Sequence, residues 1–231
     1  MEITSGRDKQ KIIFGILLAT LLSFATVIMP GIILQHFGVG YKSILIISRV
    51  LFWVCLFILT LYATRIEKNN FLLWPEKKYP FTFYLGAYPA LFGILFFGIA
   101  IINIILVKAL HFPTNGSKLN VLLDLFRQNK WLLYVTVITA GVVEEFIFRG
   151  YLMPRLQLVF KTKFLTIFIS SALFGLMHFT YGNVIQVVGP FYIGLIFALF
   201  YEKYKNIKML IIFHTFWDLF AIWLLLMQHG K

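Results

Sequence analysis

Charged residues are scarce in this chain, and acidic residues are the scarcest of them. Only 13% of the 231 residues are charged, and nine acids stand against 21 lysines and arginines. A soluble domain has about one quarter charged residues, so the composition excludes a soluble protein. Instead, 60% of the residues are hydrophobic and the mean hydropathy is +0.86. This composition is typical of a polytopic membrane protein.

Several reactive groups and motifs are also missing. Cys55 is the single cysteine, which rules out an internal disulfide. No HExxH sequence is present, so the short zinc-protease signature is absent. Ser170 and Ser171 lack a nucleophile-elbow context, which argues against a serine mechanism. The first apolar run is long enough to remain as an anchor, and we expect no cleavable signal peptide.

Long apolar runs take the place of these features. One membrane crossing needs about 20 apolar residues, and long unbroken runs in lipid favour helices. Seven runs qualify or nearly do: 12–34, 44–64, 81–107, 131–158, 164–181, 184–201 and 207–227. Residues 119–131, LNVLLDLFRQNKW, predict a short interfacial helix. We therefore predict an all-α, polytopic transmembrane bundle of about seven spans (six to eight), in one integral-membrane domain over residues 1–231.

The positive charges indicate an orientation. With seven crossings, one side collects fourteen basic residues: Arg7, Lys9, Lys11, Arg65, Lys68, Lys77, Lys78, Arg149, Arg155, Lys161, Lys163, Lys203, Lys205 and Lys208. The other side has six: Lys42, Lys108, Lys118, Arg127, Lys130 and Lys231. Since cytoplasmic loops are enriched in lysine and arginine, the N-terminus is predicted to be cytoplasmic. The net charge of +12 then reflects contact with anionic lipid rather than with nucleic acid.

The fourth run contains two adjacent carboxylates in the sequence TAGVVEEFIFRGYL. An ionisable residue at membrane depth is costly and is by default a functional-site hypothesis. Residues four apart share a helix face, so Glu145 is expected to pair with Arg149, whereas Glu144 is turned about 100° away. Glu144 is then free to face a cavity and to act as an acid or base. The alternative is a helix end near Gly150 and Pro154, where both acids are solvated.

Two later runs each carry one histidine, His178 in FGLMHF and His214 in FHTFWD. Asp218 follows His214 by four residues, so it can hold one ring nitrogen and fix the tautomer of the other. Plainer interpretations exist, with His178 as a satisfied core residue and His214–Asp218 as a polar link between helices. Together with the glutamates, these are the only strongly polar groups deep in the last four runs. We therefore predict a water-activating site inside the bundle.

Two mechanisms fit these side chains. In the first, Glu144 deprotonates a water that attacks a peptide carbonyl, and the two histidines donate hydrogen bonds to the developing oxyanion. In the second, His178 and His214 bind a divalent metal, expected to be zinc, together with the carboxylates of Glu144 and Asp218. The metal would lower the pKa of a bound water. Spacing in the sequence does not separate the glutamate-type from the metalloprotease mechanism.

Three ordered motifs carry a family resemblance: Glu144-Glu145-xxx-Arg149, Phe174-xxx-His178 and His214-xxx-Asp218. In them the sequence resembles the CPBP intramembrane protease family, also called the CAAX-protease, bacteriocin-processing or Abi family. The family pattern is EExxxR, FxxxH, then HxxxN or HxxxD, on successive membrane helices. The resemblance covers about residues 135–220 and implies a catalytic core over about 131–227.

The resemblance also implies roles for the residues. Glu144 takes the place of the water-activating base, with Glu145 and Arg149 as supporting residues. His178 and His214 would polarise the scissile carbonyl or bind metal. Asp218 stands where the prenyl-protein endoproteases of the family have Asn, which argues against a prenylated CAAX substrate.

One geometric difficulty concerns depth. At 1.5 Å per residue, His178 lies about 22 Å along its helix from the preceding loop, whereas His214 lies about 9 Å from Lys208. Straight helices that start at one surface would not bring the two rings together. We predict that residues 181–190 dip back into the bundle, with Pro190 as the first residue of the next helix.

The leading hypothesis is therefore an endopeptidase of the cell membrane that hydrolyses a bond in a membrane-associated protein or peptide. Its site is expected to open towards the cytoplasm. An alternative is a bacteriocin immunity or membrane regulatory binding protein that uses the same fold without turnover. A third reading, an ion or proton transporter, is allowed by the buried ionisable groups but lacks repeated interrupted helices. The sequence indicates no oligomeric state.

Overall fold

The computed structural model describes residues 6–113 and 117–228, and every regular element within them is a helix. Seven helical segments are long and apolar enough to cross a membrane: Gly6–Leu34, Tyr41–Ile66, Phe81–Ala109, Lys130–Phe160, Lys163–Tyr181, Ile185–Tyr204 and Ile207–Gln228. Each overlaps one of the seven predicted runs. The prediction of an all-α bundle of about seven spans is confirmed. Lys231, which contributed to the charge count above, lies outside the described residues.

Most spans are built from more than one helical element. The first three are α1 (Gly6–Met29) with η1 (Pro30–Leu34), α2 (Tyr41–Leu61) with η2 (Tyr62–Ile66), and α3 (Phe81–Asn103) with η3 (Ile104–Ala109). The fourth contains α5 (Lys130–Thr139), η4 (Ala140–Glu144), η5 (Phe146–Leu152) and α6 (Met153–Phe160). The last three contain α7 (Lys163–Leu176) with η6 (Phe179–Tyr181), α8 (Ile185–Tyr204) and α9 (Ile207–Gln228). All of these η elements except η6 are π-helical.

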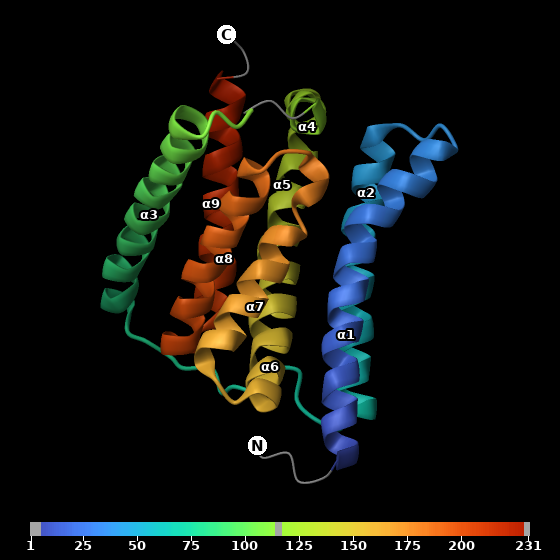
Figure 1. The fold of residues 1–231 in the computed structure, drawn as a ribbon, viewed down its shortest axis with the longest axis vertical. Coiled ribbons are helices and arrows are strands. Elements are labelled where there is room, and N and C mark those ends of the chain that lie inside the picture. The colour runs from blue at the N-terminus through green and yellow to red at the C-terminus, as the bar shows by residue number, and fades with distance from the viewer. Residues whose placement is uncertain (1–5, 114–116, 229–231) are drawn as a thin grey trace.

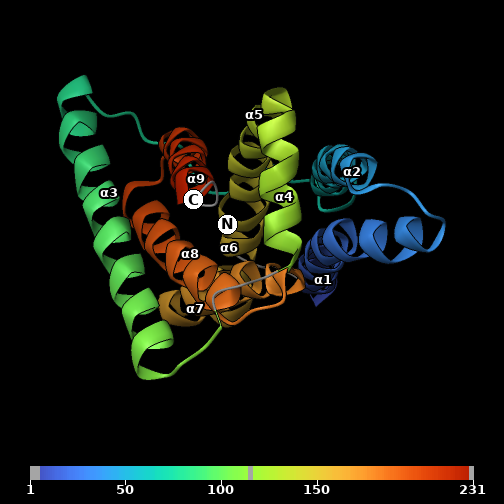
Figure 2. The same ribbon diagram turned by 90° about the horizontal axis from the view of Figure 1, so that it is seen from above.

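The predicted interfacial helix is present as α4 (Ser117–Gln128). It is seen end-on in Figure 1 and lengthwise in Figure 2, so it lies across the direction of the spans. Leu123 and Phe126 are buried, and Phe126 packs in one cluster with Leu132 and Val137 of α5. This amphipathic helix covers one end of the bundle.

The fourth span is the centre of the molecule. In the most apolar 18-residue stretch of this span, 61% is buried inside the molecule. The corresponding share is 39% or less in every other span. In Figure 1 the α1–α2 hairpin and α3 lie at opposite edges, with the remaining helices between them. The π-helical segments η4 and η5 lie within this central span. Widened turns of this kind occur often at functional sites, because they change the direction in which side chains point.

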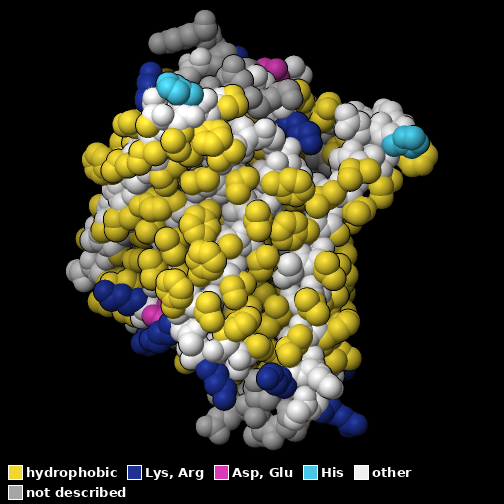
Figure 3. Space-filling model, in the orientation of Figure 1, with side chains coloured by type: hydrophobic (Ala, Val, Ile, Leu, Met, Phe, Trp, Pro, Cys, Tyr) yellow, Lys and Arg dark blue, Asp and Glu magenta, His cyan; other side chains and the backbone are white. Residues whose placement is uncertain are grey.

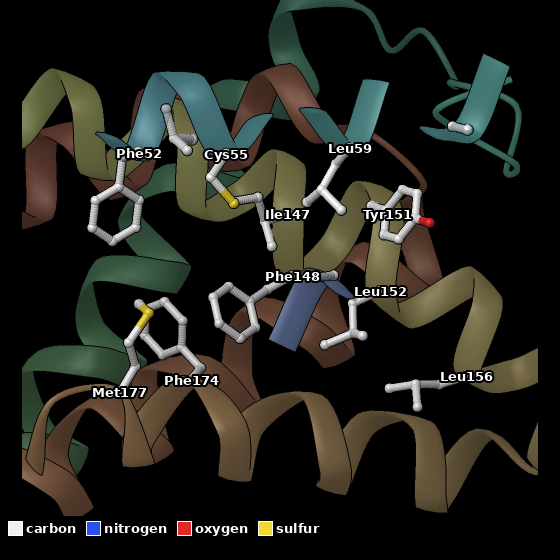
Figure 4. Packing of buried hydrophobic residues seen from close by; sticks show 13 residues of the cluster. Phe52, Cys55, Leu59, Ile147, Phe148, Tyr151, Leu152, Leu156, Phe174 and Met177 are labelled. Carbon is white, nitrogen blue, oxygen red and sulfur yellow. The ribbon is translucent and has the colours of Figure 1, made fainter. Parts of the chain in front are cut away.

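One apolar cluster joins the central span to α2 and α7, and Figure 4 shows its packing. Phe52 and Leu59 of α2 face Phe148 of η5, which meets the ring of Phe174 on α7 edge-on at 5.2 Å. Cys55, the single cysteine, is buried in the same cluster. This cluster fixes the helices on which the candidate site is built.

A buried ion pair ties the segment after α2 to α6. Glu67 accepts hydrogen bonds from the guanidinium of Arg155 and from the Tyr151 hydroxyl, the latter at 2.8 Å. Arg155 also donates to the carbonyl oxygens of Phe71 and Tyr151. Both members of the pair are buried. Because each charged group is paired and hydrogen-bonded, the pair is tolerated in the core.

This burial corrects the charge count made from the sequence. Arg149 and Arg155 were both assigned to a loop, but both side chains are fully buried inside helices. The side of the N-terminus therefore keeps twelve of its fourteen basic residues, against six on the other side. The excess still favours a cytoplasmic N-terminus.

The loop before α3 holds the start of α9. Glu76 accepts a hydrogen bond from the backbone N–H of Ile207 at 2.8 Å and another from the Tyr201 hydroxyl at 3.2 Å. Asn206 caps the same helix by accepting from the N–H of Met209. Burial raises the pKa of the Glu76 carboxyl above its ordinary value, against the effect of these two hydrogen bonds. The cap sets the depth at which α9 presents His214.

The surface is that of a multi-pass membrane protein. Figure 3 shows hydrophobic side chains over the middle of the molecule, with lysine and arginine gathered towards the two ends. Exposed apolar side chains occur on α1, α2 and α3, for example Leu21, Phe57 and Phe97. A lipid environment covers such a band.

Candidate active site

The two glutamates lie at the end of η4 and directly after it, in the middle of the central span. Glu144 is 5% exposed and Glu145 is fully buried. The helix continues through Gly150 and Pro154 to Phe160. The alternative of a helix end with two solvated acids is therefore wrong.

Glu145 is the centre of a buried hydrogen-bonded network. Its Oε1 accepts from Arg149 Nη1 at 2.9 Å, which is the i,i+4 pairing predicted from the sequence. The same oxygen accepts from Nδ1 of His214 at 2.8 Å. Arg149 Nη2 also donates to the carbonyl oxygen of Gly194 on α8 at 3.1 Å. Glu145 and Arg149 together thus link the fourth, sixth and seventh spans.

The sequence gives no signal for the contact between Glu145 and His214. The two residues are 69 positions apart. A glycine makes the approach possible, because a Cβ at Gly141 would collide with Thr215 and would lie 3.0 Å from its backbone nitrogen. Gly141 is one helical turn before Glu145, and Thr215 follows His214. The missing side chain therefore lets α9 pack directly against the central span at the level of the site.

His214 has a carboxylate at each ring nitrogen. Nδ1 is bonded to Glu145, and Nε2 lies 3.4 Å from Oδ2 of Asp218. The predicted pairing of His214 with Asp218 is present, although Glu145 is the closer partner. An imidazolium donates from both nitrogens, so this arrangement is complementary to the charged form of the ring.

His178 lies just beyond the end of α7, with its Nδ1 at 2.9 Å from the carbonyl oxygen of Phe174. Because a carbonyl only accepts, Nδ1–H is the donor, and Nε2 is left available to a ligand. The Phe174 ring lies 5.2 Å from the His178 ring and 6.0 Å from the His214 ring. The two imidazoles therefore flank one phenylalanine, as the shared-site hypothesis requires.

The connection between His178 and the next helix differs from the predicted one. A short turn and η6 follow His178, and α8 then begins at Ile185. Pro190 lies inside α8 rather than at its start, so that part of the prediction is wrong. Asn183 accepts a hydrogen bond from the N–H of Gln186 at 2.8 Å, which satisfies a donor in the first turn of α8.

Glu144 differs from Glu145 in having no hydrogen-bond or ion-pair partner among the residues that the structure describes. Its carboxylate is within electrostatic range of His214 and Asp218 on α9 and of Arg49 on α2. His178 is within range of the same three groups. An unpartnered carboxylate near the His214 imidazole has its oxygens available for a water molecule.

The same side chains are a poor ligand set for a metal ion. Across residues 6–113 and 117–228, no group of three or more His, Cys, Asp or Glu side chains is arranged to hold one. Both ring nitrogens of His214 face carboxylates, which leaves no nitrogen lone pair for coordination. A zinc ion at this site stays a prediction from the sequence.

A groove of about 750 Å³ borders this site. Its walls come from η1 and the neighbouring ends of α1 and α2, from α4, and from η6, where Tyr181 stacks on His178 at 6.1 Å. Figure 1 shows that α4 and the far end of the α1–α2 hairpin, which line this groove, lie at the end of the bundle opposite the start of α1. A cytoplasmic N-terminus and a site that opens here towards the cytoplasm are therefore incompatible.

Comparison with known proteins bears on the central and C-terminal helices. Residues 126–220 match a family model described as Type II CAAX prenyl endopeptidase Rce1-like. This segment is similar to the Rce1-like family. The match confirms the CPBP resemblance, and at family level it supports a CAAX-type intramembrane protease. The Rce1-like segment runs from α4 into α9 and contains both glutamates, both histidines and Asp218. No curated protein and no solved structure matches the chain.

Proposed function

We propose that this protein is an intramembrane endopeptidase that hydrolyses a peptide bond of a membrane-associated protein or peptide with a water activated by Glu144. The observation that carries the proposal is the contrast between two adjacent carboxylates. Glu145 is held by Arg149 and His214, whereas Glu144 is buried within electrostatic range of His214 and has no hydrogen-bond or ion-pair partner among the described residues. The Rce1-like segment supports the same reaction class.

Glu144 acts as the general base in this proposal. A carboxylate needs to approach the attacking water to hydrogen-bond distance and to hold its proton as the new bond forms. Little solvent reaches the site, so the position of the water is set by the Glu144 carboxylate and the nearby imidazoles. Glu145 acts as a positioning residue, since it fixes the ring of His214 and the guanidinium of Arg149.

The histidines stabilise the oxyanion that develops on the scissile carbonyl. The Nδ1–H of His178 already donates to Phe174, so a donor at Nε2 requires the imidazolium form of His178. His214 carries its charge next to the same space, where its field favours negative charge on the oxyanion. Asp218, 28% exposed, is the group on this face that links His214 to solvent.

The decisive experiment compares Glu144→Gln with wild type. The purified proteins are reconstituted in lipid nanodiscs with a pool of synthetic apolar peptides, and new peptide termini are detected by mass spectrometry. General-base catalysis contributes about 10²–10⁴-fold, so cleavage by Glu144→Gln is expected to fall by at least about 100-fold. The variant should elute and melt as wild type does. Undiminished cleavage by Glu144→Gln would refute the role of Glu144.

Chelation separates the glutamate-type reaction from a metalloprotease reaction. Since His214 has no free nitrogen for a metal, we expect cleavage to survive phenanthroline. Non-chelating meta-phenanthroline is the matched control. Loss of cleavage with the chelator alone, reversed by added zinc, would favour the metal mechanism and contradict the proposal.

We also propose that the protein lies in the cell membrane with its N-terminus in the cytoplasm. The twelve basic residues that remain on the side of the N-terminus, once the buried Arg149 and Arg155 are left out, support this orientation. With seven spans, the groove beside the site then faces the opposite side of the membrane. Substrate would enter from that side or from the lipid.

A further inference from the structure

Arg49 differs from the two other arginines that lie deep in the helices. Arg149 and Arg155 are each paired with a buried glutamate and with backbone carbonyl oxygens. Arg49, on α2, donates from Nε to Ser48 Oγ at 3.3 Å, and its guanidinium lies 4.8 Å from the centre of the Phe52 ring. Among the described residues, no carboxylate forms an ion pair with it.

Arg49 also lines the groove beside the site, and the groove has a consistent chemistry. Its walls are largely apolar, with side chains such as Ile28, Ile44 and Leu122. The basic side chains that line it are Arg49 and Lys118, and His36 also lines it. Of the described residues that line the groove, none is an aspartate or glutamate. In Figure 3 a hollow lies beside the projecting arm of the molecule, with a basic side chain at its edge.

We infer that Arg49 is a substrate-binding residue that takes a carboxylate of the peptide at the inner end of the groove. This inference rests on the proposed function, because it assigns a specificity element to the same site. Its basis is the unmatched guanidinium in an acid-free, apolar groove next to His178 and Tyr181. The carboxylate comes from an acidic side chain or from the C-terminus of the peptide, and the test below distinguishes them.

The position of Arg49 suits this role. Its charge acts on Glu144, His178 and Tyr181, so it lies within electrostatic range of the reacting groups. Arginine presents a planar fork of N–H donors that matches a carboxylate in two parallel hydrogen bonds. Such bonds are strong where apolar walls keep the local dielectric low. An arginine that merely extended its side chain to the interface would not distinguish peptides by charge.

The test measures binding without turnover, in Glu144→Gln protein held in phosphatidylcholine nanodiscs. One short, fluorescent apolar peptide is made in three forms. The first has an internal glutamate and an amidated C-terminus, the second has glutamine and the amide, and the third has glutamine and a free carboxylate. Hydrogen bonds to charged groups contribute enough that one anionic form is expected to bind about tenfold more tightly than the neutral form.

Variants of Arg49 then decide the assignment. Arg49→Gln should abolish the preference, Arg49→Lys should keep part of it, and Arg49→Glu should shift it to a peptide with lysine in place of glutamate. Lys42→Gln is the matched control, because Lys42 is on the same helix but bonds to Asn129 and lines a different hollow. It should keep the preference.

The outcomes separate the two proposals. Equal binding of all three peptides, or a preference that survives Arg49→Gln, would overturn the assignment of Arg49 whether or not the enzyme cleaves. A preference that depends on Arg49 supports it, and the anionic form that binds names the source of the carboxylate. Failure of the cleavage test on Glu144 would remove the proposed function and leave this binding result in place.

Discussion

At the residue scale, two neighbouring glutamates have different surroundings in the same apolar core. Glu145 shares one oxygen between Arg149 and His214, so its charge is compensated. Among the described residues Glu144 has no such partner, and it lies within electrostatic range of the His214 imidazole. Replacing a residue that holds other side chains in place should lower the stability of the protein, whereas replacing a residue that reacts should lower its activity.

Replacing Glu145 should harm stability more than replacing Glu144. Glu145→Gln leaves Arg149 buried without its carboxylate, and breaking a buried pair in this way costs about 3–5 kcal/mol. We expect its melting temperature in detergent to fall by roughly 10 °C relative to wild type. Glu144→Gln, the same chemical change one residue earlier, is the control and should melt close to wild type. Equal melting of the two variants would contradict the division of roles.

At the element scale, the C-terminal half of the central span is held by two buried polar contacts. Arg149 bonds to α8 and Arg155 bonds to the segment after α2, each through a guanidinium that is fully buried. The π-helical η5 lies between Glu145, which bonds to α9, and Arg155, which bonds to the segment after α2. The hydrogen bonds of Glu67 and Arg155 do not involve either histidine, so this pair is expected to act only through stability.

Removing one partner of the Glu67–Arg155 pair should destabilise the protein without changing the catalytic residues. Glu67→Gln leaves Arg155 uncompensated, and we expect a loss of about 3–5 kcal/mol by denaturant titration. The double variant Glu67→Leu with Arg155→Met should recover much of it, since no charge is left unpaired.

The control for this prediction is Glu202→Gln. Glu202 pairs with Lys163 at the surface, where that lysine is 66% exposed, so the cost should stay below about 1 kcal/mol. A double variant as unstable as Glu67→Gln alone would show that the pair contributes through packing rather than charge.

At the scale of the whole molecule, seven spans place the two ends of the chain on opposite sides of the membrane. The groove beside the site lies at the end away from α1's first residues (Figure 1). The orientation therefore decides from which compartment a soluble part of the substrate can approach.

Cysteine labelling in intact cells tests this orientation. Single cysteines are placed by Lys161→Cys, in the loop between α6 and α7, and by Lys108→Cys, at the other end of the bundle, in a Cys55→Ala background. With a cytoplasmic N-terminus, an impermeant maleimide should label the second and spare the first. Both should label after permeabilisation. Labelling of Lys161→Cys alone in intact cells would reverse the proposed orientation.

The sequence by itself determined the features that depend on local rules. Seven apolar runs of sufficient length became seven helical spans, because backbone groups in lipid must be satisfied within each segment. The pairing of Glu145 with Arg149 followed from helical periodicity, since residues four apart share a face. Proximity of His214 and Asp218 followed from the same rule.

Only the tertiary structure decided which of these local units meet. Glu145 binds His214 across 69 residues, and Glu67 binds Arg155 across 88 residues. Such contacts depend on how helices pack, for example on the space left at Gly141, and no periodicity in the sequence encodes them. Arg155 therefore resembled a loop charge in the sequence but is buried, and Arg49 gained its significance from the groove that the packed helices leave beside it.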